Sequence, residues 1–236
     1  MASFEASTCH NCGRKIMGLK FSSASETICT NCANSKEKSS AIKNNSQKKH
    51  NLEDSIHIGD KLASNKLKRS ITTLLEELYT DNHDKLIIIC VGTDRSTGDA
   101  LGPLTGSRLN KFTPSEIPVF GTLKEPVHAT NLQEKMKYIN NRYQNPFVLA
   151  IDAGLGNNDS IGSINIKRGP LKPGSGVNKD LPLIGNMHIT GLVNIGGYME
   201  YFVLQSTRLH LVMKMAKTIS RGVNWGLKKS KLKLLN

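Results

Sequence analysis

The chain has 236 residues, of which 38% are hydrophobic, and it carries a formal net charge of +13. This length accommodates one sizeable core with small appended modules, but it excludes a second large domain. No stretch has the length of a membrane span or the apolar character of a signal peptide, which predicts a soluble, cytoplasmic protein with no membrane partner.

The positive charge is concentrated at the two ends of the chain. Residues 1–70 hold 12 basic and 6 acidic side chains, residues 71–207 hold 12 and 13, and residues 208–236 hold 8 and none. The nearly neutral middle gives no indication of a nucleic-acid interface there. Solvated ends that favour solubility are the simpler interpretation, and weak nucleic-acid contact through the basic ends is the alternative.

Four cysteines near the N-terminus have the spacing of a zinc site. Cys9, Cys12, Cys29 and Cys32 form two C-x-x-C pairs separated by sixteen residues. This spacing predicts a zinc ribbon over residues 1–34, with a β-hairpin between the two pairs. Two disulfides would suit a secreted chain instead. Because four thiolates leave no open coordination position, we expect the Zn²⁺ to be structural. The partner of this module could be either nucleic acid or protein.

Composition divides the rest of the chain into three parts. Residues 35–60 are rich in Lys, Ser and Asn, which predicts a flexible linker. Residues 61–226 contain the long apolar segments and form the expected main domain. Residues 227–236 form a basic tail.

Hydrophobic periodicity and turn residues predict alternating helices and strands in the main domain. We expect helices at 65–80, from about Pro103, at 131–143 behind a Thr130/Gln133 capping box, and at 197–220, and strands at 86–91, 117–120, 146–152, 162–168 and 184–190. The continuous apolar strands indicate burial on both faces. The predicted fold is a three-layer α/β/α sandwich around a mostly parallel sheet.

Acidic residues follow two of the buried strands. Asp94 and Asp99 lie in the glycine-rich segment 91–103, and Asp152 lies at the end of the strand at 146–152. Ligands of such sheets bind beyond the carboxyl ends of the strands. We therefore expect Asp99 and Asp152 to converge, so that the pKa of one carboxyl rises and the pair supports acid–base catalysis.

There are two other interpretations of the glycine-rich segment. The segment could bind a nucleotide phosphate, but it lacks both phosphate-binding motifs, and its two acids would repel a phosphate group. Asp99 could instead cap the helix expected at Pro103. His188 adds a third candidate, either as a hydrogen-bonding residue or as a metal ligand together with the two aspartates.

Further residues are candidates for lining the same cleft. Glu125 and His128 lie in a loop after a predicted strand, although a surface turn explains them equally well. Gly98 lies beside Asp99, and Asn178 lies in a Pro/Gly-rich loop. With Asp94, these residues complete the predicted lining of the site.

Three motifs together carry a resemblance to a known superfamily. They are G-D-A-L-G-P at 98–103, A-I-D-A-G at 150–154 and P-G-S-G-V-N-K at 173–179. In this combination the chain resembles the germination protease superfamily, and more closely the YyaC family of spore-protease-like sporulation proteins. The resemblance covers about residues 85–224.

The resemblance implies a fold shared with the hydrogenase maturation endopeptidases and peptide-bond hydrolysis at an acid pair. In germination proteases the matching acids are the catalytic pair, which carries over to Asp99 and Asp152. In the hydrogenase maturation group an H-x-T-G-like segment helps to bind nickel or a surrogate, and His188 begins a similar segment. This implies a divalent metal held by Asp99, Asp152 and His188.

The resulting expectation is a sporulation-associated peptidase of the sporulating cell or forespore that acts on a protein or peptide. A non-catalytic peptide- or metal-binding sporulation protein is one alternative. A nucleic-acid-associated protein that uses the ribbon and basic tails is another. The sequence indicates no oligomeric state.

Overall fold

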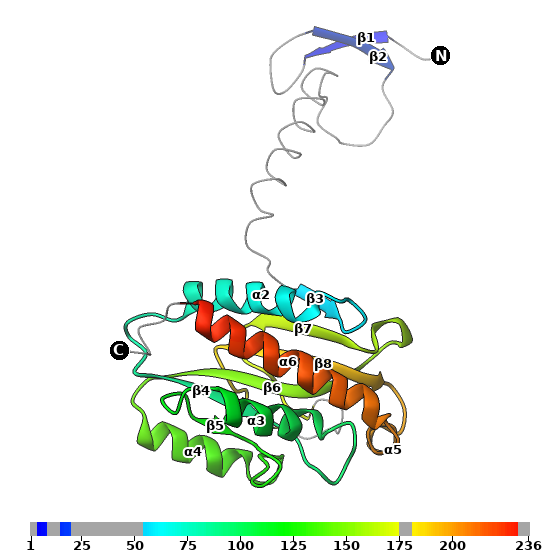
Figure 1. The fold of residues 1–236 in the computed structure, drawn as a ribbon. Helices are drawn as coiled ribbons and strands as arrows, with labels where there is room; N and C mark the ends of the chain where they lie inside the picture. The colour runs from blue at the N-terminus through cyan, green and yellow to red at the C-terminus, as the bar shows by residue number, and fades with distance from the viewer. Residues whose placement is uncertain (1–3, 9–14, 20–53, 175–180, 231–236) are drawn as a thin grey trace. The chain divides into compact units, whose positions relative to one another are not determined.

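The computed structural model describes residues 4–8, 15–19, 54–174 and 181–230 (Figure 1). The chain divides into two compact units, Met1–Asn51 and Leu52–Asn236. In the first unit, β1 (Phe4–Thr8) and β2 (Lys15–Leu19) form an antiparallel pair. The four expected zinc ligands, Cys9, Cys12, Cys29 and Cys32, lie outside the described residues, and so does Asn178.

The second unit is built on a six-stranded sheet. Its strand order is β3-β7-β8-β6-β4-β5. The strands are β3 (Asp54–His57), β4 (Lys85–Cys90), β5 (Val119–Phe120), β6 (Pro146–Gly156), β7 (Ser163–Arg168) and β8 (Met187–Ile195). β5, β4, β6 and β8 pair in parallel, whereas β7 is antiparallel to both of its neighbours. The prediction of a mostly parallel sheet is confirmed.

Helices cover both faces of this sheet (Figure 1). They are α2 (Ala63–Leu78), α3 (Leu101–Phe112), α4 (Leu132–Arg142), α5 (Glu200–Gln205) and α6 (Leu209–Lys229). α6 packs between α2 and α3 on one face, and α4 covers the other face. In β4, Ile88 packs in the core under α2, α3 and α6, whereas Ile87 and Ile89 pack in the core under α4. Burial on both faces explains the continuous apolar sequence of this strand. The predicted three-layer sandwich is confirmed.

The folded domain begins earlier than its composition indicates. β3 lies within the range 35–60 that was expected to be a linker, and it pairs with the edge of β7. Ile56 and Ile58 are both buried in the core. Hydrophobic periodicity does not predict this short strand, because it has only two buried apolar residues and follows a polar sequence. The predicted linker boundary at residue 60 is therefore wrong, since residues of β3 belong to the folded domain.

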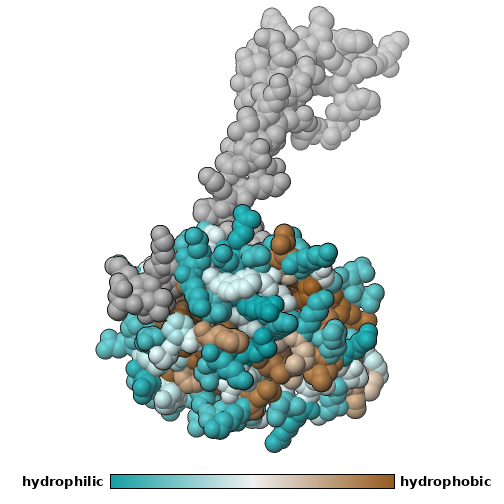
Figure 2. All heavy atoms as spheres, viewed as in Figure 1, coloured by the Kyte–Doolittle hydropathy of each residue, from teal (hydrophilic) through white to brown (hydrophobic). Residues whose placement is uncertain are grey.

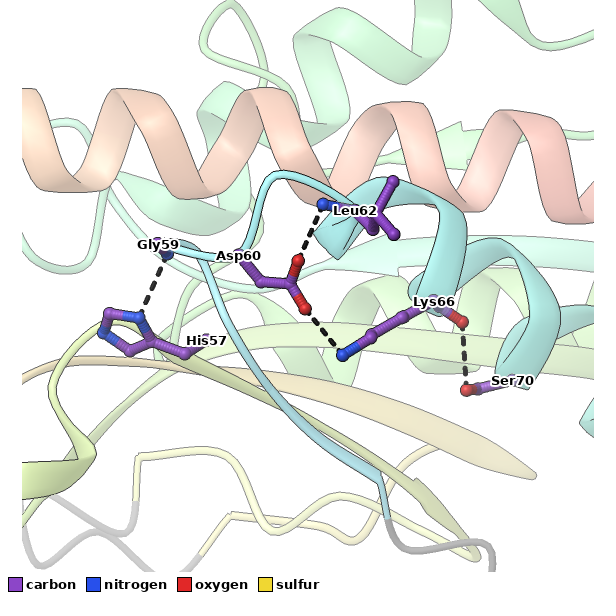
Figure 3. A network of polar contacts seen from close by, with 6 residues as sticks. All are labelled: His57, Gly59, Asp60, Leu62, Lys66 and Ser70. Atoms are coloured by element: carbon purple, nitrogen blue, oxygen red, sulfur yellow. Dashed lines mark hydrogen bonds and ion pairs between the residues drawn. The ribbon is translucent and has the colours of Figure 1, made fainter.

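A polar network joins β3 to the start of α2 (Figure 3). The Gly59 N–H donates to His57 Nδ1 at 3.0 Å, and the Leu62 N–H donates to Asp60 Oδ1 at 2.8 Å. Lys66 Nζ lies 2.6 Å from Asp60 Oδ2 and lowers the pKa of that carboxyl. The Asp60 side chain thus closes the turn that leads into the helix, as an Asx turn does.

The C-terminal helix differs from its prediction in two ways. A single helix was expected at 197–220, but α5 and α6 are separated by residues 206–208. α6 also continues to Lys229, so the first three residues of the predicted basic tail are helical. The extension follows from Leu227, which is buried against the core and adds another apolar position to the same helical face.

The predicted capping box before α4 is wrong. The N-cap residue is Asn131, and its side chain makes no capping hydrogen bond. Thr130 Oγ1 instead lies 2.8 Å from His128 Nδ1, and Asn131 Oδ1 accepts a hydrogen bond from the His128 N–H at 2.8 Å. These side chains therefore stabilise the preceding loop. Across the described ranges, no helix has both the length and the apolar character to cross a membrane.

Candidate active site

The loop between β4 and α3 folds back tightly onto the end of β4. Gly92 has a φ of 143°, and a Cβ atom there would lie 2.0 Å from the carbonyl oxygen of Asp99. A Cβ atom at Gly102 would lie 1.8 Å from the carbonyl oxygen of Val91. Only glycine permits such close backbone contacts. The two glycines thereby hold Asp99 directly over the end of the strand.

Asp152 occupies the neighbouring strand at the same edge of the sheet. Ile151 pairs with Cys90 of β4 and accepts a hydrogen bond from the Val91 N–H at 2.7 Å. Asp152 therefore lies beside Val91, at the start of the loop that holds Asp99. Its carboxyl Oδ1 accepts a hydrogen bond from the Ala153 N–H at 2.8 Å, and the residue is only 8% exposed.

The two carboxyl groups have raised pKa values. Burial raises the pKa of Asp152 to about 8, with a contribution from the negative charge of Asp99, while the N–H groups of Ala153 and Gly174 oppose the rise. Burial also raises the pKa of Asp99, and Ser96 offsets part of this change. A buried aspartate beside a second carboxyl is the arrangement that keeps one proton on the pair near neutral pH.

The capping interpretation of Asp99 does not fit the start of α3. The helix begins at Leu101 rather than at Pro103, and its N-cap residue is Ala100. Asp99 thus precedes the cap position, and its carboxyl lines an open cleft.

A cleft of about 980 Å³ lies above the acid pair. Four of the predicted site residues line it: Asp94, Asp99, His128 and Asp152. Gly98 and Glu125 do not line the cleft. Gly98 instead packs against α5, since a Cβ atom there would lie 2.7 Å from Leu204 Cδ2. The structure thus brings the acid pair together at one opening and leaves part of the predicted lining outside it.

His188 lies away from this cleft. In the pairing of β6 with β8, His188 is opposite Ala150, and Thr190 is opposite Asp152. Two residues along a strand correspond to about 6.5 Å. His188 Nδ1 is 2.9 Å from the Gly169 carbonyl oxygen, and a carbonyl only accepts, so Nδ1 carries the proton.

The expected three-residue metal set is not formed by the described residues. Among them, no three His, Cys, Asp or Glu side chains lie close enough together to hold a metal ion. Catalytic zinc sites use three such protein ligands around one centre. Asp99, Asp152 and His188 therefore do not form the three-ligand set that the resemblance implied.

The mouth of the cleft contains aromatic and apolar residues that sequence reasoning missed. Tyr198, Met199, Tyr201 and Phe202 line it, and each of these side chains is more than half exposed. Arg95 and Glu200 add charges of opposite sign. The segment follows the Gly196–Gly197 pair at the end of a strand, in a chain with only 5% aromatic residues. This local concentration of aromatic residues was the sequence signal from which the cleft mouth could have been predicted.

Main-chain contacts fix the segment that carries these side chains. The Gly98 N–H donates to the Leu204 carbonyl at 2.8 Å, which ties α5 to the loop holding Asp99. Asn194 Nδ2 donates to the Val203 carbonyl at 3.1 Å. Met199 has a positive φ of 49°, the one such non-glycine residue in the described ranges. α5 lies beyond the end of β8, so its anchored backbone presents apolar side chains at the mouth of the cleft (Figure 1).

The family of this chain is shown by a family match and by a relative of known sequence. "Uncharacterized protein YyaC" from Bacillus subtilis (strain 168) is 53% identical over 157 residues, which are 66% of this chain and 77% of that protein. Among solved structures, the [NiFe] hydrogenase maturation protease HycI from Thermococcus kodakarensis KOD1 aligns with a TM-score of 0.44 and 15% identity, over 66% of this chain and 99% of that one. The family described as "Protein of unknown function (DUF1256)" matches residues 55–222. This chain therefore belongs to the DUF1256 family.

Proposed function

We propose that the protein is a peptidase in which Asp99 and Asp152 activate water for attack on a peptide bond. The observation that carries this proposal is the buried Asp152, with a pKa of about 8, beside a second carboxyl in an open cleft. A pair of carboxyl groups that shares one proton can remove a proton from water and protonate the substrate in the same step.

The proposal gives the two acids different roles, on the basis of their environments. In this proposal the shared proton rests on Asp152, the more deeply buried group, whose pKa is about 8, and Asp99 acts as the base. Asp99 accepts a proton from water as the water oxygen bonds to the carbonyl carbon, while Asp152 donates its proton to the carbonyl oxygen. As the C–N bond breaks, Asp99 gives its proton to the leaving nitrogen, and a hydroxyl of the intermediate returns a proton to Asp152.

The mouth of the cleft supports a polypeptide substrate with an apolar side chain. Tyr198, Tyr201 and Phe202 offer exposed apolar surface within reach of the acid pair. Burying such surface against a substrate side chain would supply binding energy at about 25 cal/mol per Å². We therefore expect cleavage near aromatic or aliphatic residues.

A role in sporulation belongs to the same proposal and rests on the resemblance to the YyaC family. The check is the time at which the chain accumulates. Expression confined to sporulating cells is the expected result, and equal amounts in growing cells would contradict it.

The catalytic proposal is tested by incubating the full chain with an unfolded protein and identifying new N-termini by mass spectrometry. Asp99→Asn and Asp152→Asn should each reduce turnover by about 10²–10⁴-fold, because each removes an acid–base group. Turnover of the unaltered chain should fall as the pH rises through about 8, where Asp152 loses its proton.

Asp94→Asn is the matched control, since Asp94 lines the same cleft but is exposed. It should retain turnover. Full activity in either catalytic variant would overturn the assignment. If the unaltered chain binds peptides without cutting them, the non-catalytic alternative replaces the proposal.

A further inference from the structure

A second hollow lies on the outer face of the domain, between α2 and α6. Its volume is about 460 Å³, and five residues line it: Asn65, Lys68, Trp225, Lys228 and Lys229. We call these five residues the α2–α6 surface. Figure 2 shows hydrophilic residues over much of the face on which α2 and α6 lie. None of these residues belongs to the cleft above the acid pair.

Cations and one aromatic residue form a continuous stripe along α6. Its exposed members are Lys214, Lys217, Arg221, Trp225 and Lys228, at intervals of three and four residues. At a rise of 1.5 Å per residue, the stripe is about 21 Å long. The helix contains no acidic residue. A row of this length suits the phosphates of an extended nucleic-acid strand better than a single anion.

The lysines of the α2–α6 surface have no ion-pair partner within the described ranges. The ion pairs found there join Lys66 to Asp60 and Arg168 to Glu77. The second pair neutralises one of the two glutamates near the end of α2. Lys68, Lys228 and Lys229 therefore remain available to an anionic ligand.

Trp225 is placed to stack rather than to fill the core. It is 40% exposed, whereas the next residues of α6, Gly226 and Leu227, are buried. One part of the ring is held by the protein while the rest faces the hollow among lysines. An aromatic ring beside a positively charged groove is the common arrangement of proteins that bind single-stranded nucleic acids.

We propose that the α2–α6 surface, together with the stripe of α6 that shares Trp225 and Lys228 with it, binds single-stranded nucleic acid. The cations contact successive phosphates, a base stacks on Trp225, and the Asn65 amide contacts the edge of that base. A membrane surface fits less well, because the tryptophan lies in a hollow lined by charged and polar groups instead of projecting from an apolar face. This binding does not depend on the proposed peptidase activity.

The chain contains a single tryptophan, so its fluorescence reports directly on this surface. The test titrates the full chain with a ten-residue oligothymidylate and follows the emission of Trp225. We expect saturable quenching that weakens steeply between 50 and 200 mM salt, since each neutralised phosphate contributes about −0.7 to the slope of log K against log salt.

Two variants separate this surface from the other basic parts of the chain, using the anisotropy of a labelled oligonucleotide. Lys217→Gln/Lys228→Gln should reduce the salt slope by about 1.4 and weaken binding about tenfold or more. Trp225→Leu should weaken binding about tenfold and leave the salt slope unchanged, because stacking releases no counterions.

The matched control is Lys124→Gln/Lys137→Gln, which removes two exposed charges from a loop and from α4. It should leave both the affinity and the slope unchanged. Absence of quenching, equal losses in the control and the α6 variant, or a response of Trp225 only to vesicles containing phosphatidylserine would each overturn the proposal.

Discussion

Asp152 combines a position inside a β-strand with a carboxyl group that stays protonated at neutral pH. In the unfolded chain its pKa is the ordinary 3.8, and in the folded protein burial raises it to about 8. The folded state therefore binds more protons than the unfolded state between these two values. The contribution of protonated Asp152 to the free energy of unfolding is fully present below pH 3.8. It is lost as the pH rises from 3.8 to about 8.

Replacing Asp152 by Asn should remove this loss. We expect the free energy of unfolding of Asp152→Asn to exceed that of the unaltered chain by an amount that grows from pH 4 to pH 9 and reaches several kcal/mol, on the order of 1.4 kcal/mol per unit of pKa shift. Urea unfolding at a series of pH values measures it. Asp94→Asn is the exposed control, and an equal pH dependence in both variants would show that Asp152 is not the titrating group.

The sequence predicted the acid pair and the lining residues Asp94 and His128, but not the aromatic mouth of the cleft. Asp99 and Asp152 each follow an apolar strand, and the ends of parallel strands meet at one edge of a sheet. Whether His188 reaches that edge depends on the register between β6 and β8, which no local pattern encodes. The exposed residues Tyr198 and Phe202 were missed because their segment was interpreted as the start of a helix.

At the scale of elements, α2 and α6 pack unusually closely. A Cβ atom at Gly222 would lie 2.5 Å from Leu67 Cβ, and one at Gly226 would lie 2.7 Å from Ile71 Cγ2. The two glycines therefore set the distance between the helices. The surface formed by Lys68 and Trp225 across this contact depends on the same packing.

Gly222→Leu should destabilise the protein by about 1–3 kcal/mol, because the added side chain overpacks the contact with Leu67. Helix propensity alone would favour leucine over glycine by almost 1 kcal/mol. The sign of the change in urea unfolding therefore separates the two effects. Lys217→Leu places the same residue on the exposed face of α6 and should change stability by less than about 0.5 kcal/mol. A gain in stability at Gly222 would contradict the close packing.

Long apolar elements were predicted well, and short or interrupted ones were not. β4 and β6 follow from their apolar runs, which burial on both faces requires. β3 has four residues in a polar context and depends on pairing with β7, a contact distant in sequence. The break between α5 and α6 depends on contacts that Asn194 and Gly98 make with α5, which periodicity does not report.

At the scale of the whole molecule, the boundary of the folded domain can be tested by truncation. A fragment of residues 52–236 should unfold in one transition at the same midpoint as the second unit of the full chain. A fragment beginning at residue 61 lacks the buried Ile56 and Ile58, and it should be less stable by about 3–6 kcal/mol. Thermal unfolding followed by circular dichroism compares the two, and equal stability would show that β3 contributes nothing.

The proposed zinc ribbon can be tested on the full chain by elemental analysis. We expect about one equivalent of zinc, which Cys29→Ser/Cys32→Ser should remove, because four thiolates form a closed tetrahedral site. Cys90→Ser is the control and should keep the metal, since Cys90 is fully buried in β4 and burial raises the pKa of its thiol. Detection of two disulfides in place of zinc would contradict the prediction.

The two proposed sites lie near opposite ends of α6, and the length of the helix separates their charges. It begins after α5, which borders the cleft, and it carries Trp225 sixteen residues after its first residue, Leu209. This separation is about 24 Å along the helix axis, whereas the Debye length at physiological ionic strength is about 8 Å. Charges at one site are thus screened from the other. Neutralising Lys228, which lies beyond Trp225 on α6, should leave the titration of Asp152 unchanged, so the two proposals can be tested separately.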